Sequence, residues 1–159
     1  MPFKTVVGTD GSMRRVNLAT GNTVEAFSQL GGRGKELTAA STLTEADNDL
    51  TFFLNAGTEF ATTLPSPFLG ARFTFIVKTA PSGASYTIVT GSSANIIKGM
   101  QLHAAATAGD TGTADDTITF VDGQAVAGDM VQLWSDGTSW FAQARSRVAA
   151  GITFTQAST

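Results

Sequence analysis

The single histidine of the chain, His103, is the first residue to test for catalytic chemistry. A serine or cysteine nucleophile needs a base such as histidine beside it and a third group that orients that base. The chain contains no cysteine, and the G-x-S-x-G turn that exposes a serine nucleophile does not occur in it. His103 stands beside three alanines at the end of a predicted strand. The sequence therefore favours a surface or packing role for this histidine.

Carboxylates are the next candidates, because aspartates in and after residues 103–116 could offer oxygen ligands to calcium. The D-x-D-x-D-G spacing of a calcium loop is missing, so no metal site is predicted, and Asp115 and Asp116 are expected to solvate the loop or protect a strand edge. A glycosidase would need two carboxylates facing one cleft, and Glu45 and Glu59 show no such pattern. The sequence therefore predicts neither an enzyme nor a cofactor. The aspartates concerned are Asp110, Asp115, Asp116, Asp122 and Asp129.

Aromatic side chains could stack on a sugar, and Tyr86, Trp134, Trp140 and Phe141 are the candidates. The two tryptophans lie on the two arms of a predicted hairpin and alternate with apolar neighbours. This pattern favours packing in a core or between subunits. A glycan site remains the alternative, and it requires the tryptophans to be exposed.

The elements that position these residues are β-strands, since helix signals are nearly absent. Apolar and polar residues alternate over residues 71–79, as in a strand with one buried face. About eight to ten such runs predict an all-β fold, either a β-sandwich or a jelly-roll-like barrel. Asp-Gly at residues 136–137 predicts a hairpin, and Gly99 predicts a bulge. Candidates for the body core or a trimer interface are Phe52, Phe73, Phe75, Val77, Trp134 and Trp140.

The chain divides by pattern into three parts. Residues 1–36 hold short apolar patches that cannot build a core, so an extended N-terminal arm is expected there. The glycine cluster at residues 31–34 lacks the phosphate-loop pattern and indicates a hinge. Residues 37–145 form the predicted body, and residues 146–159 form a tail in which residues 151–155 could add an edge strand.

Charge is low and unevenly distributed. Charged residues make up 14% of the chain, so threonine rather than lysine or glutamate is expected to cover the solvated faces. Residues 1–36 carry five basic and three acidic residues, and residues 37–159 carry five and ten. The acidic body argues against nucleic-acid binding, whereas the basic arm could meet an acidic protein surface. A membrane span and a secretory signal are not predicted, so we expect synthesis in the cytoplasm.

A strand ending in L-N is followed by TLP, then by G-x-R-F-x-F-x-V and Y-x-I, within residues 50–89. This order of elements resembles that of tailed-phage structural proteins. The stretch VQLWSDGTSWF, residues 131–141, is similar to the V-x-L-x-S-D-G-T-x-W hairpin of phage head-decoration and tail-fibre domains. The resemblance covers about residues 37–145, and it rests on the order of several elements.

The resemblance implies a capsid decoration, or cement, protein. Such a protein is a β-rich homotrimer on the exterior of the phage head, where it binds the major capsid protein and stabilises the head by bridging capsomers. An alternative is a receptor- or glycan-binding domain of a phage tail or head fibre, although the long trimeric shaft of a tail fibre is missing. The candidate capsid contacts in the arm are Phe3, Val6, Arg14, Arg15, Val16, Leu18, Phe27 and Arg33.

Overall fold

The chain forms two compact units, Met1–Arg33 and Gly34–Thr159. In the described segments, β-strands and two short 3-10 turns account for the regular structure, and no α-helix occurs. None of these segments is an apolar helix long enough to cross a membrane. The computed structural model describes residues 3–7, 13–17, 23–27, 33–103 and 114–156.

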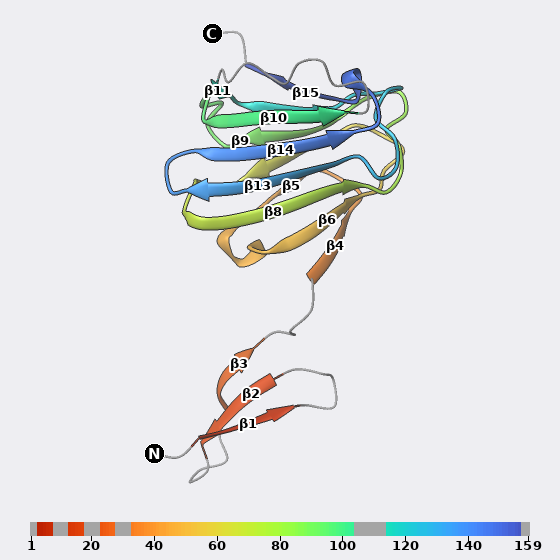
Figure 1. Ribbon diagram of the computed structural model, residues 1–159. Helices are drawn as coiled ribbons and strands as arrows, with labels where there is room; N and C mark the ends of the chain where they lie inside the picture. The colour runs from red at the N-terminus through yellow and green to blue at the C-terminus, as the bar shows by residue number, and fades with distance from the viewer. Residues whose placement is uncertain (1–2, 8–12, 18–22, 28–32, 104–113, 157–159) are drawn as a thin grey trace. The chain divides into compact units, whose positions relative to one another are not determined.

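The first unit is a three-stranded antiparallel sheet in the order β1-β2-β3 (Figure 1). Strands β1 and β2 pair in a continuous register, whereas the register between β2 and β3 shifts after Arg15. The middle strand, β2, therefore pairs on both sides, whereas β1 and β3 each pair on one side. Their bounds are β1 (Phe3–Val7), β2 (Met13–Asn17) and β3 (Thr23–Phe27).

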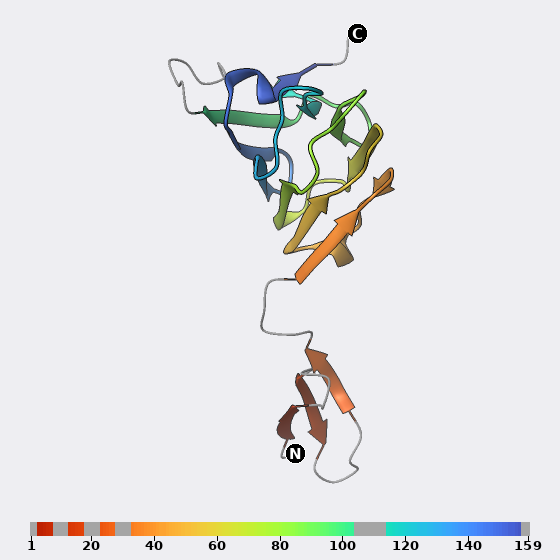
Figure 2. The same cartoon turned by 90° about the vertical axis from the view of Figure 1, so that its right-hand side faces the viewer.

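The second unit contains two sheets that share one core, so the predicted all-β sandwich is confirmed. Figure 1 looks onto the seven-stranded sheet, and Figure 2 shows the body after a quarter turn. The seven-stranded sheet has the order β11-β10-β14-β13-β8-β6-β4, and the five-stranded sheet has the order β15-β12-β9-β7-β5. Together they exceed the eight to ten strands that were predicted, partly because β5 and β11 are only two residues long.

Most strands of the body are short runs in which buried and more exposed residues alternate. The seven-stranded sheet contains β4 (Arg33–Leu37), β6 (Leu50–Leu54), β8 (Leu69–Val77), β10 (Ile97–His103), β11 (Ala114–Asp115), β13 (Met130–Asp136) and β14 (Trp140–Ser146). The five-stranded sheet contains β5 (Ser41–Thr42), β7 (Phe60–Leu64), β9 (Tyr86–Thr90), β12 (Thr117–Phe120) and β15 (Ile152–Thr155).

The chain crosses between the two sheets after each strand from β4 to β9. Two successive crossings return the chain to the first sheet in its original direction, which explains why β6 pairs with β8, and β7 with both β5 and β9, in parallel. The hairpin β13–β14 then lies between β8 and β10, where β14 pairs with β10 in parallel. Prolines assist the crossings, as at Pro65 and Pro67 between β7 and β8.

Aromatic rings fill the space between the sheets. The ring centroids of Phe52 and Phe75 are 5.2 Å apart, and those of Phe73 and Trp140 are 5.6 Å apart. All four side chains are fully buried, and each contributes about 1.5–3 kcal/mol or more by leaving water. The Trp140 Nε1 atom has no hydrogen-bond partner among the described residues, so Trp140 stabilises the core by packing alone.

Gly99 lies in a regular strand, and the predicted bulge at this position is wrong. Strand β10 pairs with β14 without interruption from Ile97 to His103. A Cβ atom at Gly99 would lie 2.2 Å from the Phe154 ring of β15. Glycine is needed here because the Phe154 ring occupies the space that a side chain would fill.

The predicted hairpin at Asp136-Gly137 joins β13 to β14. Gly137 has a φ of +95°, which favours glycine. The Asp136 carboxylate accepts hydrogen bonds from the N–H groups of Ser139 at 2.7 Å and Thr138 at 2.8 Å. These bonds and the Thr138 hydroxyl hold the pKa of Asp136 below its usual value.

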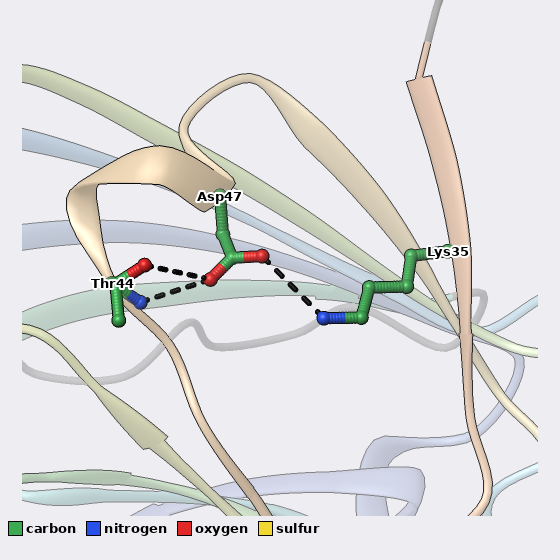
Figure 3. Close-up of polar contacts among 3 residues, drawn as sticks. All are labelled: Lys35, Thr44 and Asp47. Carbon is green, nitrogen blue, oxygen red and sulfur yellow. Dashed lines mark hydrogen bonds and ion pairs between the residues drawn. The ribbon is translucent and has the colours of Figure 1, made fainter.

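A second carboxylate organises the crossing between β5 and β6 (Figure 3). Asp47 ends the 3-10 turn η1 (Glu45–Asp47) and accepts hydrogen bonds from the Thr44 N–H at 3.0 Å and the Thr44 hydroxyl at 3.1 Å. The Nζ atom of Lys35, on β4, lies 3.5 Å from the Oδ1 atom of Asp47. Partial burial raises the pKa of Asp47, but these donors outweigh it and leave the pKa below its usual value. The contact links β4 to the turn.

Candidate binding surface

The outer side of the seven-stranded sheet carries a row of aromatic and basic side chains. Strand register aligns Lys98 of β10, Phe141 of β14, Trp134 of β13 and Arg72 of β8. Phe141 is 41% exposed, and the Lys98 Nζ atom lies 5.5 Å from the centre of its ring. Trp134 is half-buried. The row therefore places two rings side by side between two cations.

The next row along the same strands carries amide and hydroxyl groups. Gln143 of β14 and Gln132 of β13 are register partners, and Thr74 of β8 continues the row. At the β10 end the row closes with Met100, which is 51% exposed. Neither glutamine side chain hydrogen-bonds to another described residue, so both amides can bond to a ligand.

The third row is mainly apolar. Leu102 and Phe53 form its two ends, and Met130 and Ile76 lie between them. Arg145 of β14 adds one cation beside Leu102. We call the outward side chains of these three rows the aromatic face.

The aromatic face concentrates positive charge on an acidic body. Three of the five basic residues in residues 37–159 belong to it, namely Arg72, Lys98 and Arg145. Two carboxylates lie at its margin: Asp136 is engaged by the hairpin amides, and Asp49 lies 3.9 Å from Arg72. Because both members of the Asp49–Arg72 pair are about two-thirds exposed, water screens their attraction.

The outer side of the five-stranded sheet has a different composition. Its register aligns Ala61, Thr87, Thr119 and Thr153 across β7, β9, β12 and β15. A second row consists of Thr63, Val89, Thr117 and Thr155. We call these two rows the threonine face. It carries no charged residue.

One pocket of about 420 Å³ opens at the end of the five-stranded sheet. Its lining offers hydroxyl groups and backbone atoms but no acidic, basic or histidine side chain. Such a lining can hydrogen-bond to a neutral group but provides neither a general acid nor a general base. The lining residues are Thr42, Thr63, Leu64, Pro65, Ser66, Pro67, Thr90, Gly91, Ser92 and Ile96.

Two of the aspartates considered for calcium, Asp122 and Asp129, accept hydrogen bonds from backbone N–H groups instead. Asp129 is buried, and its carboxylate accepts hydrogen bonds from the backbone N–H groups of Val126 at 3.0 Å and Arg147 at 2.9 Å. Asp115 and Asp116 are also buried, so the expectation that they solvate a loop is wrong. Asp110 lies outside the described residues. Among the described residues, no group of three potential ligands could hold a metal ion.

The candidate capsid contacts of the arm are distributed over several strands. Phe3 and Val6 lie on β1, Phe27 lies on β3, and Arg33 begins β4. Strand β2 carries Arg14, Arg15 and Val16, whereas Leu18 lies outside the described residues.

The two tryptophans of the hairpin lie on opposite sides of the sheet. Trp140 is fully buried with Phe52, Phe73, Phe75 and Val77, whereas Trp134 faces outward beside Phe141. The alternation along β13 could have revealed this difference. Trp134 lies on the same side of the strand as Gln132, whereas the apolar residues Val131 and Leu133 lie on the other side. Sequence reasoning grouped the two tryptophans and so missed the aromatic face.

The chain was also compared with known proteins, and no family model, curated protein or solved structure matches it. The physical properties of the two outer faces and of the two units therefore carry the functional argument.

Proposed function

We propose that the protein is a non-enzymatic structural virion protein, a capsid decoration protein that binds the outer surface of a phage head. The observation that carries this proposal is the division into two units of opposite charge. Met1–Arg33 contains four basic and two acidic residues, whereas Gly34–Thr159 contains six basic and eleven acidic residues. A small basic unit can anchor on an acidic capsid surface while the sandwich body remains outside.

The partners in this proposal are the major capsid protein and two further copies of the chain. A homotrimer would present three basic units, so three weak contacts act together and hold firmly. Contacts to neighbouring capsomers would bridge them and resist the outward pressure of packaged DNA. The resemblance of residues 50–89 and 131–141 to phage head proteins supports the same role.

The test measures binding to heads that lack the protein. The full chain should cosediment with such heads and raise the temperature at which they disassemble, and light scattering should give three times 16.4 kDa. A chain comprising residues 34–159 should keep its folding transition but fail to bind. Cutting after Glu36 would be a poorer design, because β4 belongs to the body sheet and Glu36 pairs with Lys78 at 2.7 Å.

Equal binding of the full chain and of residues 34–159 would contradict anchoring through the first unit. Absence of binding by the full chain would contradict the decoration role.

The second candidate is a receptor- or glycan-binding domain of a phage fibre. The partly exposed rings of Trp134 and Phe141 on the aromatic face favour it.

A further inference from the structure

The aromatic face combines three chemical groups that a charged sugar chain requires. The first is a stacking platform, because Trp134 and Phe141 are register partners on adjacent antiparallel strands. Partners in such a pair have Cβ atoms about 5 Å apart, so both rings project from neighbouring positions on the same side of the sheet. The negative π-face of an aromatic ring attracts the weakly positive C–H groups of a sugar ring.

The second group is the pair of cations at the two ends of the aromatic row. Lys98 lies over Phe141, and Arg72 is the register partner of Trp134. Each cation can pair with a carboxylate on a ligand that crosses the rings. Arg72 has one exposed carboxylate, Asp49, at 3.9 Å, which is long enough for a ligand carboxylate to replace it.

The third group is the pair of amides directly behind the rings. Gln132 and Gln143 face each other across β13 and β14, and each amide can donate two hydrogen bonds and accept two. Sugar hydroxyls both donate and accept, so the two amides match them. An apolar protein partner would leave these amides without hydrogen bonds.

We propose that the aromatic face binds a carboxylated glycan, that is, a chain containing uronic or sialic acid. The sugar rings stack on Trp134 and Phe141, their carboxylates pair with Lys98 and Arg72, and their hydroxyls bond to Gln132 and Gln143. This site is independent of the anchoring role of the first unit, and its test uses no phage heads.

Charge argues against one other occupant of this face. A second copy that packs face to face would place Arg72, Lys98 and Arg145 against the same three cations. Single-stranded nucleic acid also stacks on aromatic rings, so oligo-dT is one of the comparison ligands in the test.

The experiment follows tryptophan fluorescence of the full chain during titration. Trp140 is fully buried, so a change reports on Trp134. The probes are hexagalacturonate, an alginate hexamer and a sialic acid hexamer. The comparison ligands are fully methyl-esterified hexagalacturonate, polyglutamate and oligo-dT. We expect saturable binding of at least one acidic glycan, weaker binding in high salt, and little response to the comparison ligands.

The variants separate binding from folding. Lys98→Gln combined with Arg72→Gln removes two exposed cations and should weaken binding about tenfold or more. Trp134→Ala should remove both binding and signal, and calorimetry replaces fluorescence for that variant. Lys35→Gln is the control, because Lys35 is also an exposed cation but lies beside Asp47 and away from the aromatic face. Its affinity should equal that of the wild type.

Four results would overturn the proposal. These are no saturable binding of any acidic glycan at millimolar concentration, equal binding of the methyl ester, unchanged affinity in the double variant, and stronger binding of polyglutamate or oligo-dT. The last result would assign the face to an acidic peptide or a nucleic acid instead.

Discussion

The two outer faces of the sandwich cover the same core but differ in almost every chemical property. The threonine face is uncharged and repeats one small side chain, whereas the aromatic face combines rings, amides and three cations. Folding requires only that inward positions be apolar, and threonine satisfies the outward positions of a strand well. The departure from threonine on one sheet therefore indicates a demand other than folding, and binding is the demand that its groups fit.

The largest effect should come from replacing each of the two hairpin tryptophans with alanine. Trp140→Ala should reduce the free energy of unfolding by about 3–5 kcal/mol, because it leaves a cavity against Phe73. Trp134→Ala should reduce it by less than about 1 kcal/mol, since Trp134 lies outside the core. Urea unfolding measures both. Equal losses would show that the aromatic face supports the fold and would break the contrast between the faces.

A smaller loss is expected at the contact between the two sheets. Gly99→Ala should cost about 1–3 kcal/mol, because the new methyl group overlaps the Phe154 ring and forces it to move. Gly57→Ala is the control, since a Cβ there meets no atom within 4 Å. The two variants are compared by thermal unfolding. A neutral Gly99→Ala would mean that β15 does not pack on β10 as described.

Adding the same charge to each face sharpens the comparison. Gln132→Glu on the aromatic face and Thr119→Glu on the threonine face should each change stability by less than about 0.5 kcal/mol. Only Gln132→Glu should abolish binding of an acidic glycan, because it places a carboxylate in the row beside the one that holds the ligand's carboxylates. Titration calorimetry distinguishes the two. Loss of binding in both variants would indicate a general charge effect.

The smallest effect concerns acid sensitivity at the β4 edge of the seven-stranded sheet. Hydrogen bonds from Lys78 and Asn55 hold the pKa of Glu36 below its usual value near 4.5. A lowered pKa in the folded state stabilises the protein above the unfolded pKa, and this contribution is lost as the pH falls through the folded pKa. Urea midpoints of wild type and Glu36→Gln should therefore differ slightly at pH 7 and converge in acid. A difference that grew in acid would contradict this sign.

Local patterns were sufficient to predict most strands of the body and the Asp-Gly hairpin. Alternation identified the buried face of β8, and the turn residues identified the connection between β13 and β14. The sheet order could not be predicted, because parallel neighbours such as β6 and β8 meet only after the chain has crossed the core twice. Local alternation says which residues share a face, not which distant strand lies beside them.

The candidate surface was predicted only in part. The aromatic residues were recognised, but the opposite orientations of Trp134 and Trp140 were not. Three further contributors, Lys98, Met100 and Leu102, lie on β10, whose pairing with β14 joins positions some forty residues apart. The close approach of the Phe154 ring to Gly99 was not predicted for the same reason, since Phe154 lies on β15, far along the chain.

The insertion of the hairpin β13–β14 between β8 and β10 also sets the order in which the body can be completed during synthesis. Until Met130 and the following residues leave the ribosome, β8 and β10 each expose an unpaired edge, and their partners arrive tens of residues later. Open edges attract other strands, so a chain interrupted before this hairpin should associate with itself or be degraded. Because the hairpin also carries Trp134 and Phe141, a chain interrupted before it lacks this pair of rings.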